Sequence, residues 1–199
     1  MHIVCCDFEG VWVPEIWINV SKKTGIEELK LTTRDIKDYD ELMQYRLKIL
    51  DKHNLKLKDI QNVIGTLKPL EGAIEMMNWI KSVSRLVVVS DTFTEFAGPL
   101  ISQLDYPLLF CHSLEVDENN RITGYKLRQK DPKRQVIKAL KSLNYTVIAF
   151  GDSYNDISML QEADKAFLYK PPQNVVDDYP EFPIATNYDE MKERLLQLF

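Results

Sequence analysis

The sequence predicts an α/β fold, a Rossmann-like three-layer arrangement around a parallel sheet, with a helical cap inserted after the first strand. Short apolar runs alternate with segments that carry apolar residues at three- and four-residue steps, which is typical of successive strand–helix–strand units. Three of the apolar runs end in carboxylates or hydroxyls. That pattern fits an open parallel sheet that binds its ligand at the carboxyl ends of its strands.

The expected strands are short apolar runs: the first run to Cys6, Leu86–Val89, Pro107–Phe110, Val147–Phe150, Ala166–Tyr169 and Ile184–Ala185. The expected helices between them are Gly72–Val83, Phe93–Leu104, Pro132–Leu143 and Tyr154–Ala163. A β-hairpin is expected from Leu114–Val116 and Ile122–Leu127, joined through Asp117–Arg121.

Three helix starts can be read from the residues that precede them. Asp131 can cap a helix that has Pro132 at its first position, and Thr92 can cap the segment that Phe93 opens. Asn187, followed by acidic residues, is expected to begin a last amphipathic helix that runs to the end of the chain.

The segment from Glu15 to Lys68 interrupts the alternation, because it is expected to be helical throughout, most plainly at Tyr39–His53 and Lys58–Leu67. A helical insertion directly after the first strand is placed to act as a lid over a site at the strand ends. The sequence therefore predicts a core of residues 1–14 and 69–199 and a helical cap of residues 15–68.

Composition excludes several classes of protein. A chain of 199 residues with 45% hydrophobic and 28% charged residues is long enough for one full α/β domain and a modest insertion. A net charge of -5 without a basic stripe argues against nucleic-acid binding. No window approaches the roughly 18 apolar residues of a membrane helix, and the first residues lack signal-peptide features. The expected location is cytoplasmic, with no membrane partner.

The cysteines and histidines do not indicate a metal or disulfide site. Cys5, Cys6 and Cys111 are odd in number and contain no Cys-x-x-Cys pair, so buried thiols are expected. The three histidines are scattered and show no metal-ligand spacing, so ordinary structural roles are expected for them.

The first apolar run ends in two acids, Asp7 and Glu9, followed by Gly10. Such a turn can hold one carboxylate where it attacks an electrophile and the other within reach for proton transfer. Taken alone, the pair could equally be a polar turn. The motifs at the ends of two later strands favour the catalytic interpretation.

A carboxylate nucleophile is best matched by a phosphoryl group clamped by a cation. Mg²⁺ takes hard oxygen ligands, and Asp7, Asp152 and Asp156 are of that type. Solvated loop acids are the alternative for the last two. The sequence therefore predicts a magnesium-assisted phosphoryl site.

Phosphate oxygens need donors. Ser90 and the backbone amides of Asp91 and Thr92 can supply them if they lie at a helix N-terminus, where they could also be a helix cap and nothing more. Lys133, at the second position of its expected helix, can balance the charge, and Lys130 is the nearby alternative for that role.

In these motifs the chain resembles the haloacid dehalogenase superfamily of phosphotransferases, in order and at domain spacing. Asp7 to Gly10 resemble the superfamily's acid-x-acid-Gly motif, and Ser90 resembles the hydroxyl residue that ends its second motif strand. Lys133 resembles its lysine, and Gly151 to Asp156 resemble its last acidic motif. The resemblance covers essentially the whole chain and implies the haloacid dehalogenase fold, with the insertion in the place of the first cap.

The flanking residues look like the phosphoserine:homoserine phosphotransferase branch beside the phosphoserine phosphatases. The segments that carry this likeness are Gly10–Trp17, Thr32–Asp35, Leu67–Gly72, Leu127–Arg134 and Gly151–Asp156. Glu9 stands where aspartate is common in the superfamily. Because glutamate is one methylene longer, this departure bears on whether water or an alcohol accepts the phosphoryl group, which the sequence does not decide.

The resemblance implies a role for each core residue. Asp7 would form an aspartyl-phosphate, and Glu9 would be the general acid/base, its backbone carbonyl also a magnesium ligand. Asp7 and Asp152 would hold the metal directly and Asp156 through water. Ser90 and Lys133 would bind the phosphate, and Asn155 would position groups around it.

In the cap, the resemblance implies that Glu15 meets the substrate ammonium and that Arg46 grips its carboxylate. An arginine fork also suits a carboxylate better than a lysine does. The alternative for these two residues is a surface ion pair worth under about one kcal/mol.

The leading hypothesis is an enzyme that removes phosphate from L-phosphoserine, a small phosphorylated amino acid, with water or homoserine as acceptor. One alternative is a phosphatase of another small phosphate ester, such as a methylthio-sugar enediol phosphate. The other is a non-catalytic phosphoryl-sensing module, which would need neither the second acid nor a lid. The resemblance also suggests a homodimer.

Overall fold

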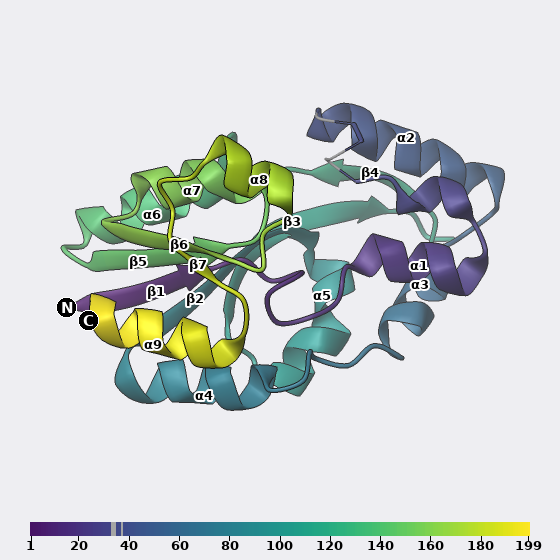
Figure 1. Ribbon diagram of the computed structural model, residues 1–199. Coiled ribbons are helices and arrows are strands. Elements are labelled where there is room, and N and C mark those ends of the chain that lie inside the picture. The colour runs from purple at the N-terminus through teal and green to yellow at the C-terminus, as the bar shows by residue number, and fades with distance from the viewer. Residues whose placement is uncertain (33–34, 37) are drawn as a thin grey trace.

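The computed structural model describes residues 1–32, 35–36 and 38–199. A twisted sheet lies between two layers of helices, and a group of helices covers one end of it (Figure 1). The predicted α/β fold with three layers is confirmed. The two termini lie close together at the opposite end of the sheet from these helices (Figure 1).

In the described part of the chain, seven strands form one sheet in the order β4-β3-β2-β1-β5-β6-β7. They are β1 His2–Cys6, β2 Arg85–Phe93, β3 Leu108–Val116, β4 Ile122–Lys126, β5 Thr146–Gly151, β6 Lys165–Tyr169 and β7 Ile184–Ala185. Neighbouring strands are parallel except β3 and β4. The first strand therefore lies at the centre, between β2 and β5, and the three strands that end in polar residues are neighbours.

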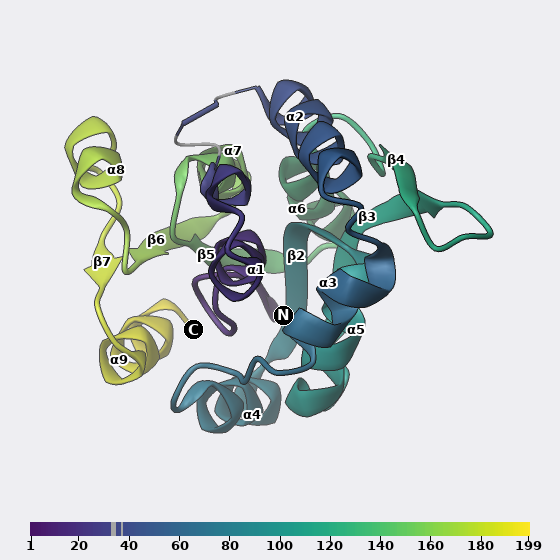
Figure 2. The ribbon, with the colours of Figure 1, turned by 90° about the vertical axis from the view of Figure 1, so that its right-hand side faces the viewer.

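Helices cover both faces of the sheet. On one face lie α4 Ala73–Val83, α5 Thr94–Ile101 and α9 Tyr188–Leu198, and on the other lie α6 Pro132–Ser142, α7 Ile157–Glu162 and α8 Gln173–Asp178 (Figures 1 and 2). Alternate residues of the central strand enter separate cores: Val4 and Cys6 pack on the first side, and Ile3 and Cys5 on the second. This is the two-residue period of a strand buried on both faces.

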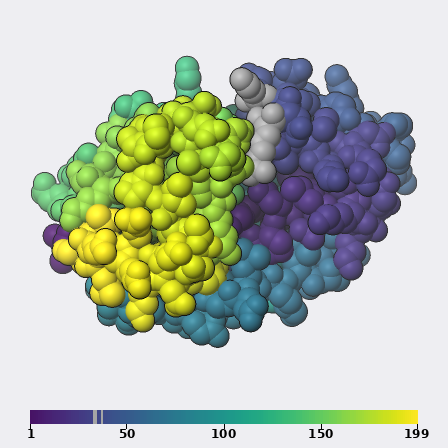
Figure 3. Space-filling view, viewed as in Figure 1, coloured from purple at the N-terminus to yellow at the C-terminus, as the bar shows by residue number. Residues whose placement is uncertain are grey.

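The cap helices are α1 Ile16–Thr24, α2 Tyr39–Lys52 and α3 Leu57–Ile64, with a 3₁₀ turn, η1, at Glu27–Lys30. They lie together beyond the strand ends, and in the space-filling view they form one side of the molecule while α8 and α9 lie on the other (Figure 3). The expectation of helix throughout was wrong, because separate short helices alternate with turns. Helix α1, for example, is terminated by Gly25, the residue after its last, which takes a left-handed φ of 73°.

The second strand is longer than expected and the next helix begins later. Phe93, expected to open a helix, still belongs to β2 and pairs with His112 of β3 after a register shift that follows Val89. Thr92 therefore does not cap α5, whose first residue is Thr94. The motif Ser90-Asp91-Thr92 lies along the end of a strand and not at a helix N-terminus.

The expected third strand and the first arm of the expected hairpin are one strand, β3. Its first part pairs with β2 and its last part pairs with β4, so one continuous strand changes partner along its length. The hairpin arm Ile122–Lys126 is confirmed within one residue. A short helix, α8, was not expected. The expected helix from Tyr154 is split into a 3₁₀ turn, η3 Tyr154–Asp156, and α7.

Of the three predicted helix starts, the one at Asn187 is fully confirmed. Asn187 caps α9 by accepting a hydrogen bond from the backbone N–H of Glu190 at 2.9 Å. Pro132 does lie at the first position of α6, but Asp131 has a left-handed φ of 51° and no side-chain cap bond. Its Oδ1 accepts from the Ser158 hydroxyl instead, at 2.7 Å. None of the helices formed by the described residues is both long and apolar enough to cross a membrane.

Candidate active site

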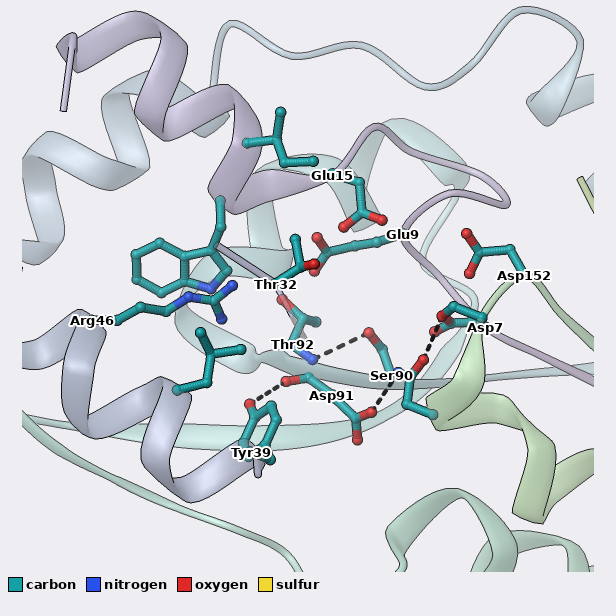
Figure 4. Close-up of a pocket in the computed structure, with 15 residues that line it drawn as sticks. Asp7, Glu9, Glu15, Thr32, Tyr39, Arg46, Ser90, Asp91, Thr92 and Asp152 are labelled. Carbon is teal, nitrogen blue, oxygen red and sulfur yellow. Dashed lines mark hydrogen bonds between the residues drawn. The ribbon is translucent and has the colours of Figure 1, made fainter. Parts of the chain in front are cut away.

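The acidic residues converge at the carboxyl ends of three neighbouring strands. Asp7 follows β1, Ser90 lies near the end of β2 and Asp152 follows β5. These three residues line one pocket of about 100 Å³, together with residues of the cap helices (Figure 4). The polar residues that the sequence places at the ends of three strands therefore meet at one pocket.

Asp7 is buried and meets an equally buried lysine. Lys133 Nζ lies 2.9 Å from Asp7 Oδ1 and 2.7 Å from Asp156 Oδ1. Burial alone lowers the pKa of Lys133, but the carboxylates around it raise that pKa well above its ordinary value, so the ammonium stays charged. Lys130, the alternative from the sequence, is exposed. The geometry therefore assigns the charge-balancing position beside Asp7 to Lys133.

Asp156 holds the turn that carries Asp152. Its Oδ2 accepts the backbone N–H groups of Asp152 and Ser153, at 2.9 and 3.1 Å, and its Oδ1 faces Lys133. The turn packs closely against this carboxyl group, because a Cβ at Gly151 would come within 2.3 Å of Asp156 Cγ. Asp156 is thus engaged with protein donors through both oxygens, which fits a contact with a metal through water better than direct ligation.

A divalent cation fits the charge and donor set here. Carboxylate oxygens of Asp7, Asp152 and Asp156 lie within 4.8 Å of one another. Burial and the nearby Asp156 raise the pKa of Asp7 well above its ordinary value, and the same two causes raise the pKa of Asp152 to about 7. Lys133 offsets only part of this negative charge. Hard oxygen ligands with excess negative charge are what Mg²⁺ requires.

Glu9 lies between this cluster and the cap. Its Oε2 accepts the backbone N–H of Ile16, the first residue of α1, at 2.7 Å. Burial and the neighbouring Glu15 raise the pKa of Glu9 to about 7, although the bond from Ile16 opposes them. A carboxyl group with a pKa near neutrality can both give and take a proton, which general acid/base catalysis needs. Gly10 makes the turn possible with a φ of +74°, and a Cβ there would come within 2.5 Å of Asp152 Oδ2.

The end of β2 and the turn after β5 are joined by side chains. Asn155 Nδ2 donates to Asp91 Oδ2 at 2.7 Å, and the backbone N–H of Thr92 donates to Ser90 Oγ at 3.2 Å. All four of these residues line the pocket. Because the Thr92 amide already donates to Ser90, the Ser90 hydroxyl and the second N–H of the Asn155 amide are donors that this side can offer to an anion.

Arg46 reaches the pocket from cap helix α2, at the opposite end from Asp7 and Asp152 (Figure 4). Its side chain is buried, stacks over the Trp17 ring at 4.6 Å and donates to the Leu31 carbonyl at 2.9 Å. Among the residues that the structure describes, none accepts a hydrogen bond from its Nε. A buried guanidinium with spare donors is suited to an anionic ligand group.

Glu15, the residue that precedes α1, lines the same pocket near Glu9 (Figure 4). Glu15 and Arg46 therefore both face the cavity, and Arg46 is too deeply buried to belong to an exposed surface pair. All the site residues expected from the sequence lie at this pocket or in its supporting cluster. Thr33 and Arg34, within a segment that carried the resemblance, lie outside the described residues.

Tyr39 and His112 are among the residues at the site that the sequence did not predict there. Tyr39 lines the pocket and its hydroxyl donates to the backbone carbonyl of Asp91 at 2.8 Å. His112 is buried behind Asp91. Tyr39 occupies an ordinary position at the start of an amphipathic helix, and His112 belongs to no motif. No signal in a single sequence distinguishes either of them.

The family model for haloacid dehalogenase-like hydrolases matches residues 8–164. The chain is 56% identical over 197 residues to a Pseudomonas aeruginosa protein named phosphoserine phosphatase ThrH, covering 99% of this chain and 96% of that protein. It is 55% identical over 197 residues to a protein of Pseudomonas syringae pv. tomato named phosphoserine phosphatase, covering 99% of this chain and 83% of that protein.

Solved structures share the fold at lower sequence identity. A phospho-aspartyl intermediate analogue of phosphoserine phosphatase aligns with a TM-score of 0.77 at 19% identity, covering 98% of both chains. A substrate-bound phosphoserine phosphatase complex also aligns with a TM-score of 0.77, at 18% identity, covering 98% of this chain and 97% of that one. The α/β core and its arrangement of helices are thus those of these structures.

Proposed function

The chain belongs to the haloacid dehalogenase-like hydrolases, and from that premise we propose that it removes phosphate from L-phosphoserine through an aspartyl-phosphate on Asp7, with magnesium and with water or homoserine as acceptor. Family membership makes the chain an enzyme with a phosphatase fold, and the alternative of a non-catalytic sensing module is set aside. The substrate is proposed because both curated relatives carry the name phosphoserine phosphatase.

One observation carries this proposal: a single small pocket has a buried nucleophile at one end and a buried arginine at the other. Asp7 and its acidic neighbours are suited to a phosphoryl group, and Arg46 is suited to a carboxylate. Glu15, between them, is suited to an ammonium group. A phosphorylated amino acid has these three groups on a short chain, whereas a sugar enediol phosphate has neither the carboxylate nor the ammonium.

The first half of the proposed reaction transfers the phosphoryl group to the enzyme. An Asp7 oxygen forms a bond to phosphorus while the bond from phosphorus to the serine oxygen breaks. Glu9, with a pKa of about 7, gives its proton to the departing serine oxygen. Lys133, 2.9 Å from Asp7, offsets the negative charge that gathers around the phosphorus.

The second half reverses the role of Glu9. The acceptor hydroxyl gives its proton to Glu9 while its oxygen forms a bond to phosphorus, and the bond to the Asp7 oxygen breaks. Asp7 and Asp152 would hold the magnesium ion directly, with the Glu9 carbonyl as a further ligand and Asp156 through water. When bound, the ion supplies positive charge that draws the phosphate and the nucleophile together.

Homoserine is expected to compete with water for the phosphoryl group. With L-phosphoserine as donor, added homoserine should yield phosphohomoserine beside inorganic phosphate, because a pocket that releases serine can admit an amino alcohol one methylene longer while the phosphoryl group remains on Asp7. Phosphorus-31 NMR separates the two products. If millimolar homoserine changes neither products nor rate, the transfer to homoserine is wrong and hydrolysis alone remains.

Arg46→Ala is expected to raise KM for L-phosphoserine by roughly ten- to a hundredfold, as loss of a charge-assisted hydrogen bond to a carboxylate requires. KM for p-nitrophenyl phosphate, which has no carboxylate, should change little. Arg121→Ala is the matched control. Arg121 is exposed, and its Nε lies 2.7 Å from Oδ1 of Asp51, a residue of α2, the helix that also carries Arg46. Equal losses on both substrates would move Arg46 from recognition to folding or to the core chemistry.

A further inference from the structure

His112 is a buried histidine that the mechanism above does not use. It lies on β3, and its side chain is 2% exposed. The rings of Tyr39 and Phe93 pack on it, each with a centroid distance of 6.2 Å. The position is next to the pocket and separated from it by Asp91.

A hydrogen bond to the imidazole indicates where its proton lies. The backbone N–H of Arg128 donates to His112 Nδ1 at 3.1 Å, so this nitrogen is the acceptor and carries no proton. The ring proton is therefore assigned to Nε2. His112 Nε2 lies 3.5 Å from Asp91 Oδ1, and the imidazole donates toward that oxygen.

Asp91 connects this histidine to the catalytic cluster. Its Oδ1 faces His112, while its Oδ2 accepts from Asn155 Nδ2 at 2.7 Å and lies 3.7 Å from Lys133 Nζ. Burial alone raises the pKa of Asp91, but Lys133, His112 and Asn155 lower it to about 2. The carboxylate is thus ionised and held by donors on both of its oxygens.

The lengths of the Lys133 contacts show what this restraint achieves. The ammonium lies 2.9 Å from Asp7 and 2.7 Å from Asp156, but 3.7 Å from Asp91. A free carboxylate at the position of Asp91 would turn toward the ammonium and form a closer ion pair. The hydrogen bond from Asn155 and the contact with His112 Nε2 hold it back, so Lys133 stays with the nucleophile and its supporting acid.

We propose that His112 is a positioning residue for phosphoryl transfer, which acts by holding the Asp91 carboxylate so that Lys133 and Asn155 keep their places beside Asp7. The inference rests on the proposed function, because its effect is on the phosphoryl-transfer step. Tyr39 of the cap supports the same residue through its backbone, since its hydroxyl donates to the Asp91 carbonyl at 2.8 Å.

Kinetics of two His112 variants test the proposal. His112→Phe keeps a ring but removes the N–H donor. It should lower kcat about tenfold, which is the lower end of the usual cost of losing a residue that orients a site residue. KM for L-phosphoserine should change less than about twofold, because Arg46 lies at the opposite end of the pocket from Asp7. His112→Gln keeps an N–H near the position of Nε2 and should recover most of the rate.

A double-mutant cycle identifies the route of the effect. In an Asp91→Asn background, His112→Phe should cause no further loss of kcat, since the carboxylate through which it acts is gone. His53→Phe, at an exposed histidine of the cap, is the matched control and should behave like wild type. Losses that multiply in the double variant, or equal losses in the Phe and Gln variants, would assign His112 a packing role and overturn the proposal.

A measurement on the unmodified protein does not depend on how the variants fold. Nitrogen-15 NMR of the full chain reports which imidazole nitrogen carries the proton. We expect the ring proton on Nε2 and none on Nδ1, and a proton on Nδ1 would overturn the proposal. A wild-type protein without activity on phosphate esters would instead be a failure of the proposed function, whereas an active wild type with an equally active His112→Phe variant would be a failure of this inference alone.

Discussion

Asp7→Asn is expected to lower phosphate release from L-phosphoserine by more than about a thousandfold and to leave the fold intact. The amide keeps the shape of the side chain but cannot attack phosphorus, and no alternative nucleophile takes its place in the proposed reaction. Because burial and Asp156 disfavour the charged form of Asp7, removing its charge should not lower the melting temperature. Steady-state kinetics and thermal unfolding followed by circular dichroism measure the two effects.

The control for this substitution is Asp105→Asn, which removes a carboxylate that is 91% exposed and outside the site. It should match wild type in both measurements. Substantial activity in Asp7→Asn protein with an unchanged circular dichroism spectrum would refute covalent catalysis by Asp7.

Removal of divalent cations is expected to have the second large effect. Exhaustive chelation should abolish phosphate release and excess Mg²⁺ should restore it, because the carboxylates of Asp7, Asp152 and Asp156 lie within 4.8 Å of one another with Lys133 as their close counter-charge. Mg²⁺ should also raise the melting temperature of the wild type, since an ion that binds the folded state stabilises it.

Asp152→Asn provides the matched comparison for the metal. Its midpoint for Mg²⁺ in the thermal-shift titration should move to a higher concentration, because one direct ligand has lost its charge. Full activity after exhaustive chelation would make the metal assignment wrong. A melting temperature that Mg²⁺ does not change would contradict the proposed binding of Mg²⁺ to the folded protein.

Much of the fold could be predicted because the sheet is buried on both faces. Central strands of that kind are continuous apolar runs, and β1 and β5 were predicted within one or two residues. The end of β2 was not, because Ser90-Asp91-Thr92 has the composition of a helix cap. Its extended form depends on pairing with β3, as the Phe93–His112 register shows. Tertiary pairing overrode the local signal there.

Some site residues could likewise be predicted from the sequence, and others could not. Residues in motifs, such as Asp7 and Asp152, could be found from the sequence because strand ends bring them together. Glu15 and Arg46 were found only through the family resemblance. Tyr39 and His112 could be found only from the three-dimensional structure. Each acts through a contact with Asp91, which lies 52 residues along the chain from Tyr39 and 21 from His112. The homodimer, the cytoplasmic location and the division into core and cap stay predictions.

The most direct test of the proposed mechanism is to trap the phosphorylated enzyme. Purified protein is mixed with L-phosphoserine and Mg²⁺, quenched in acid and reduced with borohydride, which converts an aspartyl-phosphate into a homoserine residue, and its peptides are mapped by mass spectrometry. We expect that residue at position 7, dependent on substrate and absent in Asp7→Asn protein. Phosphate release from L-phosphoserine with Asp7 unmodified, or with the change at another residue, would contradict the account.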